Sequence, residues 1–117
     1  MKRLTLLIIL LLSTQLFANW TTLYKNEQII ISFLFYAEAD NYNNGVVLKI
    51  ENLTNNNLSY KFKLIFKAGN KLKSTIVEDD LLPNQIKAGE NEGLFWIPFP
   101  NVNGITEVGI TSIDIQP

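Results

Sequence analysis

The chain of 117 residues contains no cysteine and no histidine. Without cysteine it can form no disulfide, and it cannot carry the lipidated cysteine of a bacterial lipoprotein. Without either residue it lacks Cys-His and Ser-His-Asp nucleophilic machinery, proton transfer by imidazole, and the usual ligands of zinc or copper. Carboxylates and lysines are what remains for catalysis, and the acids fall mostly at turns and strand ends. We therefore predict a protein that is not an enzyme and needs no cofactor.

Long apolar runs are also scarce, and the clearest one lies at the N-terminus. Residues 2 and 3 are basic, residues 4–12 are apolar with a single exception, and a polar break then leads to the small residue Ala18. This order is typical of a secretory signal peptide, and the run is much shorter than the span of about 20 residues that a bilayer requires. We predict cleavage after Ala18, which separates a signal peptide (1–18) from a single domain (19–117). The mature protein would be exported, to the periplasm or the exterior, and would have no membrane span.

Positive charge is scarce in the predicted mature chain. Removal of Lys2 and Arg3 leaves eight lysines and no arginine against eleven acids, a net charge of −3. Nucleic-acid binding calls for a basic face, and docking on anionic lipid calls for basic clusters. The composition therefore argues against both kinds of partner.

Strand patterns are what the mature sequence does contain. Residues 29–36 are β-branched and aromatic, which favours a strand, and 46–52 alternates between apolar and polar side chains. The alternation is clearest over 58–67, where lysines lie on one side and large apolar residues on the other, the pattern of a half-buried antiparallel strand. The residues on its apolar side are Tyr60, Phe62, Leu64 and Phe66.

Turn signals rich in asparagine and glycine separate these segments. They occur at 41–45, 54–57 and 68–70, and further strands are predicted at 71–77, 93–99 and 105–115. In the last of these the apolar parity slips, which predicts a bulge at Gly109 or Ser112. About seven strands in about 100 residues predict an all-β fold, an immunoglobulin-like antiparallel β-sandwich. Its expected core includes Tyr60, Phe62, Leu64, Phe66, Val46, Leu48, Ile50, Leu72 and Ile76, with parts of 29–36 and 94–99.

The stretch 78–92 is predicted to be the longest loop, and it begins with the adjacent acids Glu78, Asp79 and Asp80. Calcium takes oxygen ligands alone, so these three carboxylates could bind it together with backbone carbonyls. Adjacent acids in a loop are more often simply solvated. Calcium is therefore the weaker interpretation, and no metal site is assigned.

The most apolar segment of the second half is 94–100, and it offers a candidate contact surface. If Phe95, Ile97 and Phe99 face the core, then Leu94, Trp96 and Pro98 face outward. An exposed tryptophan beside a proline on an edge strand is a plausible contact for a partner. The alternative is that the sandwich and its loops cover both faces of this segment.

The order of motifs along the chain permits one comparison. An apolar strand ends in an asparagine-rich turn at 46–56, a second strand ends in a turn at 64–69, and Leu82-Pro83 and the turn 87–90 precede another apolar strand. Over 46–99 this order resembles the small exported immunoglobulin-like modules of bacteria, such as the FxLYD-type domains. The resemblance implies an accessory or binding domain at the cell surface, with no catalytic residues to carry over.

Taken together, these features predict an exported, non-catalytic binding or assembly module that contacts a protein or a surface glycan at the cell envelope. An edge strand or the loops at one end of the sandwich would make the contact. The alternative is a small accessory carrier or inhibitor protein that acts through the predicted loop 78–92.

Overall fold

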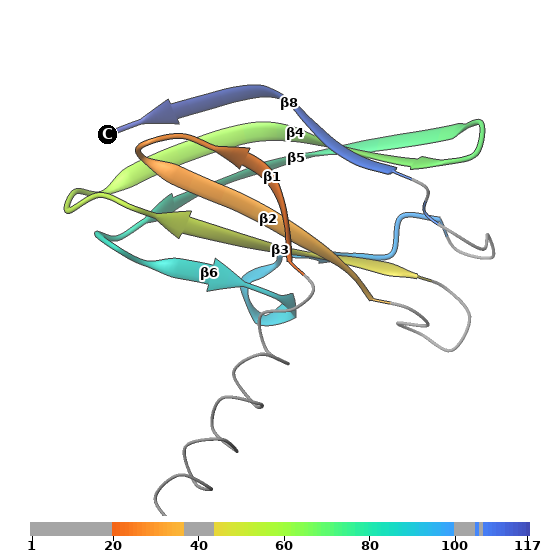
Figure 1. Ribbon diagram of the computed structural model, residues 1–117, viewed down its shortest axis with the longest axis horizontal. Helices are drawn as coiled ribbons and strands as arrows, with labels where there is room; N and C mark the ends of the chain where they lie inside the picture. Colours follow the sequence, from red (N-terminus) through yellow and green to blue (C-terminus); the bar gives the residue numbers. More distant parts are fainter. Residues whose placement is uncertain (1–19, 37–43, 100–104, 106) are drawn as a thin grey trace, which may run out of the picture.

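A computed structural model shows an all-β protein whose strands form two antiparallel sheets (Figure 1). It describes residues 20–36, 44–99, 105 and 107–117, so the predicted signal peptide lies outside the described residues. The described part has no α-helix and contains one short 3₁₀ helix, η1 (Glu90–Glu92). The strands are β1 (Thr21–Lys25), β2 (Ile29–Tyr36), β3 (Gly45–Asn52), β4 (Leu58–Ala68), β5 (Lys71–Leu81), β6 (Ile86–Ala88), β7 (Phe95–Trp96) and β8 (Glu107–Gln116).

Two layers result from the way these strands pair. Sheet A has the order β1-β2-β3-β6, with β7 also on β3, and sheet B has the order β5-β4-β8. Strands β6 and β7 pair with successive parts of the same edge of β3. Between them the chain leaves the sheet as η1 and returns through a bridge between Gly89 and Leu94. The fourth position of sheet A is therefore one strand interrupted by an excursion.

The chain reverses where the turn signals predict. Strands β2 and β3 pair antiparallel, although residues 41–43 of the turn predicted between them lie outside the described part. Strands β4 and β5 form a hairpin with a two-residue loop. In this loop Gly69 has a φ of 60°, a conformation that glycine adopts without a steric cost. The turn at 54–57 instead carries the chain from sheet A to sheet B. The chain crosses again after β5 and after β7, which stacks the two sheets.

The core lies between the sheets, and β4 contributes its centre. The apolar side of β4 is buried along its whole length, whereas its lysines are exposed, as the alternation predicts. Strands β2 and β3 supply the opposing layer. The largest fully buried side chains are Phe62, Ile29, Ile31, Leu48, Ile50, Leu58, Leu64, Leu81 and Val46. Each large apolar side chain buried in this way stabilises the fold by roughly 1.5–3 kcal/mol.

The predicted core is wrong at Leu72 and Ile76, which are 66% and 54% exposed. The antiparallel register places Val77 beside Phe62, and Ile76 beside the outward Lys63. Side chains alternate strictly between the faces of a strand, so Val77 points to the core and Ile76 to solvent. Because apolar residues occur at both parities of β5, its sequence alone does not say which set is buried.

The parity slip in β8 is a bulge, and it occurs at Ser112, one of the two predicted positions. Lys63 pairs with Thr111 and Lys61 pairs with Asp114, so two residues of β8 oppose the single residue Phe62. Ser112 has a φ of 54°, which is unusual for a residue with a side chain. The bulge lets both flanking stretches of β8 direct isoleucines toward the core.

A buried asparagine joins two of the crossings between the sheets. The Asn52 side-chain nitrogen donates to the carbonyl oxygens of Asn56 (2.8 Å) and Leu82 (2.9 Å). Its side-chain oxygen accepts from the Thr54 backbone nitrogen (2.9 Å) and from the Thr54 hydroxyl (2.8 Å). The amide thus satisfies polar groups in the connection after β3 and in the connection after β5. A buried polar side chain is stable only when it is hydrogen-bonded in this way.

Candidate functional site

The segment 94–99 has the opposite orientation to the predicted one at Leu94, Phe95 and Trp96, whereas Phe99 is buried in the core as predicted. Leu94 is 3% exposed and belongs to the core, and Pro98 is buried as well. Trp96 lies beside the buried Val46 in the register of β7 on β3. Its ring centroid is 6.1 Å from that of Phe66, across the interface between the sheets. The prediction that Leu94, Trp96 and Pro98 face outward is therefore wrong, because the excursion before β7 resets which residues point inward.

Phe95 takes the outward position instead and forms part of an apolar patch on the outer face of sheet A. The register places Leu34 beside Val47, and Val47 beside Phe95. Tyr36 follows on the same face, is 55% exposed, and has its ring centroid 6.4 Å from that of Phe95. We call Leu34, Tyr36, Val47 and Phe95 the sheet A patch. One signal in the sequence pointed to it, since Val47 is the apolar exception on the polar side of 46–52.

A cation–π pair borders the sheet A patch. Lys49 follows Val47 on the same face of β3, and its side-chain nitrogen lies 4.6 Å from the ring centroid of Trp20. Such a pair keeps an aromatic ring and the aliphatic stem of a lysine together at the surface. The patch therefore has an apolar centre and a charged border, which is the arrangement of many protein interfaces.

The three adjacent acids lie in a strand, and the prediction that they begin a long loop is wrong. Strand β5 runs through Glu78, Asp79 and Asp80 to Leu81, and β6 begins at Ile86. Alternation puts Asp79 on the inner face and its two neighbours on the outer face. The three carboxylates therefore do not converge on one point. In the part of the chain that the structure describes, no group of three or more His, Cys, Asp or Glu residues could hold a metal ion.

Two of these acids have partners within the protein. Lys87 of β6 donates to Asp79 over 2.8 Å, which links the edges of the two sheets. The Ser59 hydroxyl donates to the Asp80 carboxylate over 2.6 Å, and the Asp80 backbone nitrogen donates to the Asp79 carboxylate over 2.8 Å. These contacts give Asp79 and Asp80 a structural role that requires no metal.

The Asp79–Lys87 pair leads to a testable prediction about the pKa of Asp79 and the pH dependence of stability. The hydrogen bond from Lys87, assisted by that from the Asp80 backbone, holds the pKa of the Asp79 carboxyl below its ordinary value. The pair therefore contributes stability above the unfolded pKa of about 3.9, and that contribution is lost as the pH falls through the folded pKa. Lys87→Met should raise the pKa of Asp79 toward its ordinary value, with a small effect on stability because the carboxylate is half-exposed. NMR titration of Asp79 measures this, with Lys61→Met as the control that should leave it unchanged.

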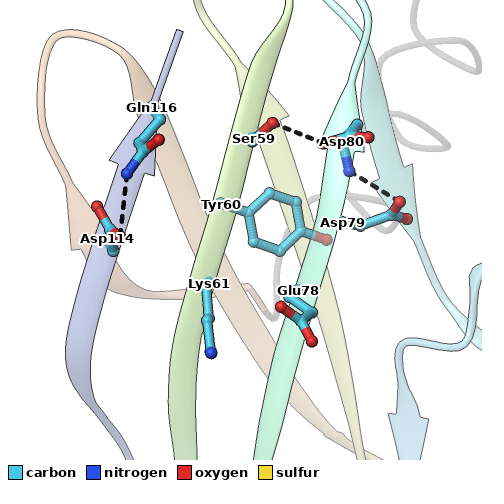
Figure 2. Close-up of a pocket in the computed structure, with 8 residues that line it drawn as sticks. All are labelled: Ser59, Tyr60, Lys61, Glu78, Asp79, Asp80, Asp114 and Gln116. Carbon is cyan, nitrogen blue, oxygen red and sulfur yellow. Dashed lines mark hydrogen bonds between the residues drawn. The ribbon is translucent and has the colours of Figure 1, made fainter.

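An open depression of about 410 Å³ lies on the outer face of sheet B, at the end that holds the acids (Figure 2). Tyr60 lies beneath it, and Figure 2 shows its hydroxyl directed toward β5. Burial, followed by the charge of Asp79, raises the pKa of this hydroxyl, so it stays neutral across the physiological range. The depression is lined by Ser59, Tyr60, Lys61, Glu78, Asp79, Asp80, Asp114 and Gln116. Its chemistry is that of an acidic, solvated surface.

The described residues thus offer surfaces for contact: an apolar patch on sheet A and an acidic depression on sheet B. No helix within them is long and apolar enough to cross a membrane. Comparisons of the chain with protein-family models, with curated proteins and with solved structures gave no match.

Proposed function

We propose that this protein is an exported, non-catalytic binding or assembly module that contacts another protein through the sheet A patch. The observation that carries the proposal is the position of Tyr36 and Phe95, which stand together on the outer face of sheet A beside Leu34 and Val47. Tyr36 is exposed and the other three side chains are half-buried. Contiguous apolar surface that reaches solvent commonly marks an interaction site. Tyrosine and phenylalanine are also enriched in the centres of such sites.

The composition of the patch favours a protein partner over a glycan. Its four side chains offer one hydrogen-bonding group, the hydroxyl of Tyr36. A sugar presents many hydroxyls, each of which needs a partner when it leaves water. An apolar partner surface makes no such demand. The patch therefore fits a partner that brings its own apolar side chains.

An immunoglobulin-like sandwich is the finer fold that we propose for the domain. In support, β3 lies between β2 and the interrupted strand β6/β7, while β4 lies between β5 and β8. The chain thus crosses from one sheet to the other between central strands, as in Greek-key sandwiches. The likeness to small exported modules of bacteria belongs to the same proposal.

A double variant tests the binding surface. Tyr36→Ser with Phe95→Ser should abolish capture of the partner from cell-envelope extract, because it removes both rings of the patch. The control is Leu53→Ser with Leu82→Ser, which changes two exposed apolar residues in the connections after β3 and β5, away from the sheet A patch. Capture by the control should match that of the unchanged protein. Equal capture by all three proteins would contradict the proposal that the sheet A patch binds the partner.

Export has its own test. The full chain produced in a bacterial host should leave the cytoplasm and lose residues 1–18, because the basic start, the short apolar run and Ala18 match what signal peptidase recognises. Mass spectrometry of the exported protein should give a chain that begins at Asn19. Replacing Ala18 by a bulky residue should leave the precursor uncut. An intact chain in the cytoplasm would contradict the prediction.

A further inference from the structure

Strand β8 forms one edge of sheet B, and its outer edge has no partner among the described strands. It pairs with β4 on one side alone, so about half of its backbone N–H and C=O groups point away from the sheet. Strand β1 of the opposing sheet lies near β8 but pairs with β2. Figure 1 shows β8 at the upper boundary of the sandwich, with β4 on its inner side. Such an edge is a template for another extended chain.

The remaining edges carry features that discourage pairing. Strand β5 has lysines at its start and three acids near its end, and β1 has five residues with an irregular register. The edge formed by β6 and β7 is interrupted by the η1 excursion. Charges, short length and interruptions are the usual ways in which natural proteins protect edges. Strand β8 is ten residues long, contains neither lysine nor proline, and has charge only at Glu107 and Asp114.

Burial along β8 is incomplete on its inner side. Phe62 and Leu64 of the neighbouring β4 are fully buried, whereas Ile110, Ile113 and Ile115 of β8 pack against the core and remain only partly buried. A further strand beside β8 would lie over this open flank. Its inward side chains would remove the exposed part of these isoleucines from water, which favours association.

A hollow on the outer face marks the part of β8 where a partner side chain fits. It has a volume of about 230 Å³ and lies where Gly109 leaves no side chain beside Ile65. A Cβ built on Gly109 would meet nothing within 4 Å. A large side chain on an added strand, directly opposite Gly109, would cover this gap. Aromatic residues placed across from an edge glycine stabilise sheets in this way.

The charge of the region indicates which residues would flank that side chain. Glu107 lies two residues before Gly109 on the same outward side, and at the far end of β8 Asp114 borders the acidic depression with Glu78 and Asp80. A second β8 would bring its own carboxylates to this edge, and like charges opposite each other are unfavourable. Lys67 and Lys61 of β4 stand beside Glu107 and Asp114 on the inner side of β8, one strand further from the added segment. Basic residues on the added strand would therefore meet the two carboxylates first and complement them. This charge complementarity favours a different, basic segment over a second copy of the chain.

We propose that β8 binds an extended segment of a partner protein by strand addition along Glu107–Thr111, with an aromatic residue over Gly109 and basic residues beside it. The inference rests on the proposed binding function and names a second surface for it, separate from the sheet A patch. The segment would alternate apolar side chains facing the core with aromatic and basic side chains facing outward, as strand geometry requires.

A peptide of defined sequence tests the proposal with the full exported chain. The heptapeptide Val-Lys-Val-Tyr-Val-Lys-Val reads the same in both directions, so it can pair with β8 parallel or antiparallel while keeping tyrosine opposite Gly109. In an NMR titration, the amides of Glu107–Thr111 should shift and become protected from hydrogen exchange. The same peptide with glutamate in place of both lysines should bind more weakly, by a factor of about ten or more.

Gly109 and Ser74 lie on either side of Ile65 on the outer face of sheet B, so valine at each position gives a matched pair of variants. Gly109→Val fills the hollow and should weaken the lysine peptide about tenfold while leaving the melting temperature unchanged or higher, because a Cβ fits there and valine favours strands. Ser74→Val lies on the opposite side of Ile65, on β5, and should leave binding unchanged. Shifts centred on another strand, or equal binding by both variants, would overturn the proposal.

Three further outcomes separate this inference from pairing with a second copy and from the function on which it rests. Protection of β8 that grows with protein concentration, without peptide, would mean that the edge pairs with a second copy, and this would overturn the assignment to a basic segment. Absence of peptide binding, while capture of the envelope partner still depends on Tyr36 and Phe95, would reject strand addition and leave the binding function standing. If the peptide binds β8 but capture of the envelope partner does not depend on Tyr36 and Phe95, only the assignment to the sheet A patch is rejected.

Discussion

Phe62→Ala is expected to lower the free energy of unfolding by about 3–5 kcal/mol, the range observed when a large aromatic residue is removed from a core. Phe62 is fully buried at the centre of β4 and stacks near Tyr60, with ring centroids 5.8 Å apart. Sheet A closes over this position from the other side, so the neighbours cannot easily collapse into the space. Domains of this size are stable by about 5–15 kcal/mol, which makes the loss a large fraction of the total.

Urea denaturation followed by circular dichroism measures the effect, and Leu72→Ala is the matched control. Leu72 lies on the neighbouring strand and is also large and apolar, but it is exposed, so its loss should change stability by at most about 0.5 kcal/mol. Similar losses for the two variants would contradict the assignment of the inner face of sheet B. The comparison also tests the register of β4 and β5, since that register is what separates the two residues.

Asn52→Leu is expected to lower the free energy of unfolding by about 1–3 kcal/mol, although leucine is apolar and of similar size. The replacement leaves the backbone nitrogen of Thr54 without its partner, whereas the carbonyl oxygens of Asn56 and Leu82 each lose one of two hydrogen bonds and keep those from the Thr54 hydroxyl and the Gln85 backbone nitrogen. Each buried polar group left without a partner costs about 1–3 kcal/mol. A gain of apolar surface at one site offsets only part of that cost. The thermal midpoint of the variant should fall accordingly.

Asn57 supplies the control for this second prediction. It is exposed and lies in the same connection, and Asn57→Leu should change stability by no more than about 0.5 kcal/mol. Backbone amide exchange adds a readout specific to the network, because the amides near Thr54 and Leu82 should lose protection in Asn52→Leu alone. Unchanged exchange in that variant would show that other contacts hold the two connections together.

Strand character could be read from the sequence wherever one face is apolar and the other charged. Strand β4 is the clearest case, because its lysines and its aromatic residues occupy opposite parities without ambiguity at most positions. The hairpin turn at Gly69 and the bulge at Ser112 were also within reach, since each has a local signature: a glycine in a turn and a slip in parity. All of these depend on residues close together in the chain.

Face assignment failed where both parities of a strand are apolar. In β5 the register with β4 selects Val77 over Ile76, and before β7 the excursion selects Trp96 over Phe95 for the interior. A shift of one residue in the pairing register moves every side chain of a strand to the opposite face of the sheet. A small uncertainty in the register therefore inverts the whole prediction of which residues are buried. The candidate partner surface moved for this reason, from Trp96 to Tyr36 and Phe95.

The amino-acid sequence by itself determined the all-β character, the one-sided burial of β4 and the lack of thiol or imidazole chemistry, because composition and the two-residue period are properties of a single strand. Only the tertiary structure decided that Asp79 meets Lys87, that Phe95 joins Tyr36 on the outer face of sheet A, and that no described strand pairs with the outer edge of β8. Each of these depends on which strands lie side by side. Pairing between distant segments is chosen by the burial of the whole domain, and no local pattern contains that information.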